Sequence, residues 1–124
     1  MRVRHIDGQD YRLPNDLNAF QEEIFVHLID WKWKHITKEV GWYEYKKKLI
    51  PYDAILPESC AAEMRVLYPP LVETTKNHHQ KFPFRIHEHF NHMASSQAAN
   101  INLFLSILLS PCADNILSAI NPSY

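Results

Sequence analysis

The chain has 124 residues, of which 46% are hydrophobic and 22% are charged, so it has the size and composition of one globular domain with a real core. Its net charge of -1 gives no electrostatic case for nucleic acid or an anionic membrane as a partner of this chain alone. The first residues lack an apolar signal segment, and Cys60 and Cys112 form no CxxC pair. We therefore expect a cytoplasmic protein with reduced thiols and no membrane contact.

The N-terminal segment, residues 1–13, alternates loosely on either side of Asp7-Gly8, which is a hairpin signal. We expect a small β-ribbon here that takes no part in the core.

Apolar residues then recur at helical spacing from Asn15 to Val40, on two faces of the expected helix. Asn15 or Asp16 is the expected N-cap, and Gly41 is the expected stop. A helix with two apolar faces packs on two sides, and a domain this small has few elements to cover both. The pattern therefore predicts a homodimer through this helix.

The middle of the chain contains several proline signals. Residues 42–51 read as a connector or short strand with a basic tip, and Pro57 is expected to open a short helix that reaches Leu67. Pro69-Pro70 is expected to end that helix, and residues 71–80 are only weakly helical.

Residues 89–113 contain no Lys, Arg, Asp or Glu. Within them, Met93 to Leu109 has helical spacing and is apolar around most of its circumference, which is typical of a buried core helix. A last short helix is expected from Cys112 to Ile120, with Asn121-Pro122 as its stop. The fold class expected is mainly α: one helical domain, residues 1–124, around a buried central helix, with at most a short N-terminal hairpin.

The central segment also carries a motif. Ser95-Ser96-Gln97-Ala98 followed by Asn102-Leu103-Phe104 resembles the signature of a family of restriction-endonuclease-like proteins in the PD-(D/E)xK nuclease superfamily. The similarity extends over roughly residues 30–109 in order. It implies that Ser95, Ser96, Gln97 and Asn102 belong to a helix that flanks a nuclease sheet and helps to shape its cleft.

The family's catalytic strands, which carry an Asp and then Glu-x-Lys, should follow this helix, and the fifteen residues after Leu109 cannot contain them. The resemblance thus implies the N-terminal portion of a longer nuclease-like protein, inactive alone. Mg²⁺ and DNA are expected only for a longer protein, and no cofactor is expected for this chain.

Two further sets of residues are weak candidates for catalysis or metal binding. Asp30 with Glu44 and Lys46 matches the acidic pair and lysine of magnesium-dependent nucleases by letters, but Asp30 lies in a helical pattern where a strand end is required. The second set, His87, His89 and His92, could ligate zinc only if the segment bends, because side chains at i and i+2 of a helix point apart.

Two binding roles remain open for other residues. The tryptophans and lysines of residues 31–34, with Lys46 to Lys48, could contact nucleic acid, although they also fit a helix face and its C-terminal end. Ser95 or Ser96 is expected to cap the central helix, and Gln97 and Asn102 to bond backbone groups of the loops around residues 51–57 or Pro83.

Three functions compete on this sequence. The first is the N-terminal portion of a nuclease-like protein, without catalytic residues. The second is a self-associating helical interaction module, and the third is a small His-metal enzyme. Whether the reading frame continues past Tyr124 into a strand with Asp and Glu-x-Lys would separate the first two.

Overall fold

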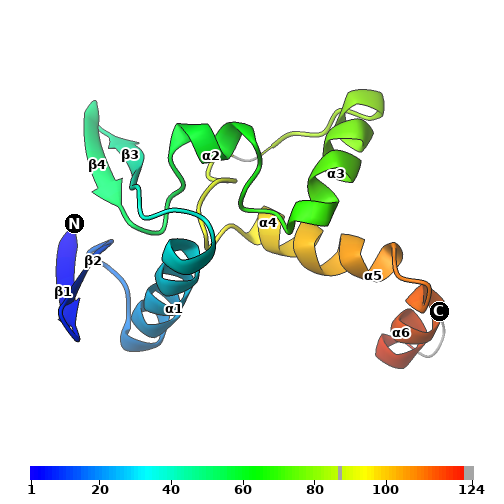
Figure 1. Ribbon diagram of the computed structural model, residues 1–124, viewed down its shortest axis with the longest axis horizontal. Coiled ribbons are helices and arrows are strands. Elements are labelled where there is room, and N and C mark those ends of the chain that lie inside the picture. The colour runs from blue at the N-terminus through cyan, green and yellow to red at the C-terminus, as the bar shows by residue number, and fades with distance from the viewer. Residues whose placement is uncertain (87, 122–124) are drawn as a thin grey trace.

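The structure, a computed structural model, describes residues 1–86 and 88–121 (Figure 1). The elements in order are β1 (Arg2–Ile6), β2 (Gln9–Leu13), α1 (Ala19–His35), β3 (Gly41–Tyr45), β4 (Lys48–Tyr52), α2 (Glu58–Ala62), α3 (Pro69–Lys81), α4 (Ser96–Asn100), the π-helical η1 (Ile101–Leu105), α5 (Ser106–Leu108) and α6 (Ala113–Ile120). Within the described residues the strands form two separate antiparallel hairpins, β1-β2 and β3-β4. The domain is therefore mixed α and β, and the expectation of a mainly helical fold is wrong.

The second hairpin was missed because its turn has no conventional hairpin sequence. Lys46 and Lys47 occupy the turn with φ of 49° and 62°, a left-handed conformation that Asn and Gly adopt more easily. In the first hairpin, which the sequence did predict, Asp7 and Gly8 have φ of 48° and 79°.

The first hairpin belongs to the core, contrary to expectation. Tyr11 and Leu13 on β2 are 4% and 0% exposed, and they pack with Ile29 of α1 and with Ala54. The Tyr11 ring stacks on Trp33, with centroids 5.0 Å apart. Alternation along β2 thus buries one face of a strand whose other face is exposed.

Helix α1 is shorter at both ends than its apolar pattern predicted. Asn18 is the N-cap, in a capping box with Gln21, so the cap is neither Asn15 nor Asp16. The helix ends at His35, and Gly41 begins β3 instead of stopping the helix. A Cβ on Gly41 would lie 2.7 Å from the carbonyl carbon of Ile55, so this position needs glycine for a close approach of two backbones.

A buried lysine joins α1 to the chain after β4. The Lys32 side chain is 0% exposed, and its Nζ donates to the carbonyl oxygens of Glu39 at 2.6 Å and Asp53 at 2.8 Å. Burial lowers the pKa of Lys32 to about 8, against the opposing charge of Asp53. The buried Asp53 carboxylate in turn accepts from the backbone N–H of Arg12 at 2.7 Å, which ties β2 to the same point.

The first two helices after the second hairpin, α2 and α3, begin at prolines. Pro57 is the N-cap of α2, which ends at Ala62 and does not reach Leu67 as expected. Pro69 is the first residue of α3, so Pro69-Pro70 starts a helix where it was expected to end the preceding one. A second core cluster forms between these helices and α4, from Leu67, Phe90 and Ala98.

The central helix was expected to be buried, but most of it is not. Ser95 caps it, since its Oγ accepts from the Ala98 N–H at 3.2 Å, but the helix contains a π-helical stretch and projects away from the hairpins with α6 at its far end (Figure 1). We call residues 96–120 the C-terminal arm. Its exposed large apolar residues are Leu103, Phe104, Leu108, Leu109 and Ile120.

The arm contains one charged residue, Asp114, and many apolar ones. Ala98 is nevertheless the only residue of the arm that is buried. Among the described residues no single helix has the length and apolar composition to cross a bilayer. The bent pair Ser96–Leu108 and Ala113–Ile120 meets that test jointly, at an angle of 119°.

Candidate functional site

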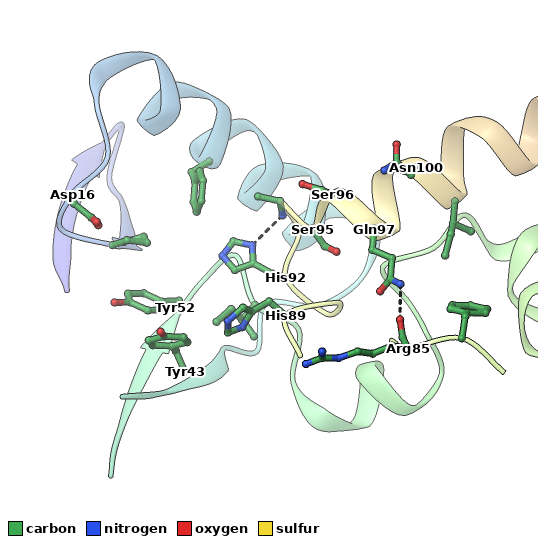
Figure 2. Close-up of a pocket in the computed structure, with 16 residues that line it drawn as sticks. Asp16, Tyr43, Tyr52, Arg85, His89, His92, Ser95, Ser96, Gln97 and Asn100 are labelled. Carbon is green, nitrogen blue, oxygen red and sulfur yellow. Dashed lines mark hydrogen bonds between the residues drawn. The ribbon is translucent and has the colours of Figure 1, made fainter. Parts of the chain in front are cut away.

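A cleft of about 1080 Å³ lies between the second hairpin, α1 and the start of the arm. Two backbone hydrogen bonds hold residues 91–93, which precede the arm, against the chain after β4. Leu56 N–H donates to Asn91 O at 3.0 Å, and Met93 N–H donates to Ala54 O at 2.7 Å. This pairing places residues 89–97 opposite β3 and β4 across the cleft (Figure 2).

One end of the cleft is aromatic. Tyr43 of β3 and Tyr52 of β4 have ring centroids 5.9 Å apart, and the Tyr43 ring lies 5.6 Å from that of His89. Phe25 of α1 meets His92 edge to face at 5.3 Å. Both tyrosines are half-buried, and burial raises the pKa of Tyr52, so its phenol stays protonated at neutral pH.

His92 is held in one neutral form. Its Nδ1 accepts from the backbone N–H of Ala94 at 3.0 Å, which places the ring proton on Nε2. Burial, with a smaller effect of His89, lowers the pKa of His92 to about 4. At pH 7 the imidazole is therefore an N–H donor without charge.

The other end of the cleft is polar, and the family-motif residues lie there. Ser95, Ser96 and Gln97 line it with Arg85, whose side chain points across the cleft toward His89 (Figure 2). Gln97 Nε2 donates to the Arg85 carbonyl oxygen at 2.9 Å, which fixes the segment near Pro83 as expected.

Asn102, the remaining motif residue, lies outside the cleft. Its Oδ1 accepts from the Tyr68 N–H at 2.7 Å and its Nδ2 donates to Val66 O at 3.2 Å. It therefore bonds backbone groups as predicted, but those of the turn before α3 and not of residues 51–57 or Pro83.

The nuclease-like candidates do not converge in the part of the chain that the structure describes. Asp30 Oδ1 accepts from the Tyr11 hydroxyl at 2.6 Å. Glu44 lines a separate recess of about 310 Å³ beside Glu88 and Asn91, and Lys46 lies in the hairpin turn. No interaction between described residues joins Asp30 to Glu44 or Lys46.

The histidine candidates are only partly described. His89 and His92 both line the cleft, and His87 lies outside the described residues. Among residues 1–86 and 88–121 no group of three or more His, Cys, Asp or Glu is placed to hold a metal ion.

The tryptophan and lysine cluster does not form a stacking platform. Trp33 is packed against Tyr11, Lys32 is fully buried, and only Trp31 and Lys34 are exposed. Lys46 to Lys48 lie on the second hairpin, which is a different element.

Sequence reasoning missed Tyr43, Tyr52 and Arg85 as site residues. The sequence does contain a signal for the two tyrosines, because aromatic residues lie on both sides of the basic segment 46–48. This is the pattern of a hairpin whose turn is formed by Lys46 and Lys47. Nothing local identifies Arg85, because its position depends on the contact between residues 54–56 and 91–93.

Comparison with protein-family models, with curated proteins and with solved structures finds no match to this chain.

Proposed function

We propose that this chain is the N-terminal portion of a restriction-endonuclease-like protein of the PD-(D/E)xK superfamily and that it does not cleave DNA on its own. The observation that carries the proposal is the position of the motif: Ser95, Ser96 and Gln97, which are far from any hairpin in sequence, line one wall of the cleft. Ser95 also caps the helix and Gln97 also bonds the Arg85 carbonyl oxygen, while the exposed Ser96 faces the cleft, so the motif both folds the start of the helix and forms part of the cleft wall.

The separation of Asp30 from Glu44 and Lys46 supports the second half of the proposal. Metal-assisted phosphodiester hydrolysis needs carboxylates on one metal and a lysine beside the attacking water. Asp30 is engaged with Tyr11 on one side of the fold, and Glu44 and Lys46 are on the second hairpin. Catalysis would then belong to strands outside this chain, with Mg²⁺ bound there.

Two experiments test the proposal. The purified chain should leave supercoiled plasmid intact with Mg²⁺ or Mn²⁺, and the genomic reading frame should continue into a strand with Asp and then Glu-x-Lys. Metal-dependent cleavage that is lost in Glu44→Ala and kept in the exposed control Glu63→Ala would overturn it, as would a reading frame that has no such strand.

A second function, self-association, is favoured by one observation on α1. Its inner face packs on the first core, but Phe20, Ile24 and Trp31 on the outer face are 70%, 41% and 47% exposed. We call these three residues the outer face of α1. A second copy of the chain is the partner proposed for it, since like helices can cover each other across a two-fold axis.

A further inference from the structure

The aromatic end of the cleft is shaped for a planar ring. Tyr43 and Tyr52 are half-buried, and they come from adjacent strands, which fixes their backbone positions. Their ring centroids are 5.9 Å apart with the planes tilted by 42°, and the His89 ring lies 5.6 Å from Tyr43 at the same tilt, so three neighbouring rings offer faces to a ligand (Figure 2). Aromatic side chains bind flat heterocycles by stacking and tolerate different bases, because every base has a π face.

The polar end is suited to one anionic group. The exposed guanidinium of Arg85 forms no ion pair with any described residue, and it points across the cleft (Figure 2). Guanidinium binds phosphate through two parallel N–H donors. The exposed Ser96 also lines the cleft, but on its α1 side and away from the Arg85 guanidinium (Figure 2), so Arg85 is the anchor for the anion.

The charges of the cleft limit how many anions it can hold. Arg85 is the one cationic side chain among its described lining residues, and Asp16 is the one anionic side chain. A nucleic-acid strand brings a phosphate with every nucleotide, and proteins that follow a strand need a row of cations. A ligand with a single anionic group fits this lining better.

We propose that the cleft binds a free nucleoside monophosphate, with its base against Tyr43 and Tyr52 and its phosphate at Arg85. The cleft volume of about 1080 Å³ is ample for such a ligand and for water beside it. The proposal does not depend on the nuclease-like assignment, because its evidence is the lining of the cleft. The same chemistry occurs at the end of a strand, so the experiment includes both sources.

The test is calorimetric titration of the full chain with each of the four nucleoside 5′-monophosphates in turn. At least one should bind, and Arg85→Gln should weaken its affinity about tenfold because a charge-assisted contact to phosphate is lost. Tyr43→Leu should weaken it by a similar factor because stacking is lost. The controls are Arg65→Gln, at a half-buried arginine, and Tyr68→Leu, at an exposed tyrosine; neither residue lines the cleft, so both variants should leave affinity unchanged.

Partial ligands and a strand complete the experiment. The nucleoside and inorganic phosphate should each bind more weakly than the nucleotide. Binding of phosphate as tightly as the nucleotide, unaffected by Tyr43→Leu, would overturn the stacking half of the site. A short single strand that binds where no mononucleotide does would refute a free nucleotide as the ligand, and absence of all binding would refute the site.

Discussion

Asn102 links two parts of the chain that are far apart in sequence. Its amide bonds the backbone of Tyr68 and Val66, which lie 34 and 36 positions earlier. The two bonds satisfy both halves of the amide and hold the turn before α3 against the arm. Because Asn102 lies in the π-helical η1, the wider helix turn and this bond occur at the same place.

Asn102→Ala should lower the free energy of unfolding by about 1–3 kcal/mol, because a backbone donor and a backbone acceptor lose their partner. Urea denaturation followed by circular dichroism measures the change. Asn77→Ala is the matched control, since Asn77 is exposed on α3 and should show little effect. Equal midpoints for the parent and Asn102→Ala would contradict a structural role for the amide.

Because of Lys32, the free energy of unfolding depends on pH in the alkaline range. In the folded chain its pKa is lowered to about 8, mainly by burial, while the unfolded value is 10.5. Between these values the unfolded chain binds more protons than the folded one, so stability rises with pH. Tyr11 sets the upper limit, because its pKa is raised to about 12 by burial and by Asp30, and the unfolded tyrosine ionises first above pH 10.

The parent should therefore gain about 2 kcal/mol in unfolding free energy between pH 8 and pH 10, relative to Lys32→Met. Chemical denaturation at three pH values in that window measures it. Lys34→Met serves as control, because Lys34 is an exposed lysine two positions later in α1 and its variant should keep the parent's slope. Parallel pH profiles for the parent and Lys32→Met would show that the buried amine does not titrate in this window.

At the scale of the element, the second hairpin is built on an unfavourable turn. Both Lys46 and Lys47 lie in the left-handed region, where residues other than Gly, Asn and Asp are disfavoured. The hairpin is nevertheless held, because β4 leads directly into the buried Asp53 and Ala54.

Lys47→Gly should raise the melting temperature, with a gain of about 0.5–1 kcal/mol, since glycine removes the steric cost of a positive φ. Lys48→Gly is the matched control: it is one position later, in β4, where glycine costs stability. A drop in melting temperature for Lys47→Gly would mean that the turn is different in solution.

The sequence predicts an element well when neighbouring residues determine it, and poorly when residues far away in the sequence do. The first hairpin was predictable because Asp7-Gly8 is itself the turn. Helix α3 was predicted only weakly, over residues 71–80, and its start at Pro69 was not predicted. The arm was predicted as a helix but not its exposure: periodicity shows that Leu103, Phe104 and Leu108 share an apolar surface, and it contains no information on whether another element covers them. The cleft was half predictable, since the motif residues were singled out while Tyr43 and Arg85 depend on long-range pairing.

For the whole molecule, the two exposed apolar surfaces have different expected partners. The outer face of α1 is proposed to meet a second copy, and the arm is the part nearest to the strands that the proposed longer protein would add. Neither surface is covered within residues 1–86 and 88–121.

The chain should be a dimer at micromolar concentration, and the double variant Ile24→Glu and Trp31→Glu should be monomeric, because buried carboxylates would oppose the contact. Light scattering with size exclusion measures the mass. Leu103→Glu with Leu108→Glu changes the arm in the same way and should stay dimeric. A monomeric parent at high concentration, or a dimer that is lost only in the arm variant, would contradict the proposed dimer contact through α1.

The sparse packing of the arm has a consequence for amide hydrogen exchange. Helix α6 has no buried residue and touches the rest of the described chain chiefly through α5, so it can open without disturbing either core cluster. Its amides should exchange with deuterium far faster than those around Ile29 and Leu13, at a rate that mild denaturant barely changes. Cooperative exchange of α6 with the hairpins would instead reveal that a partner covers the arm and joins it to the folding unit.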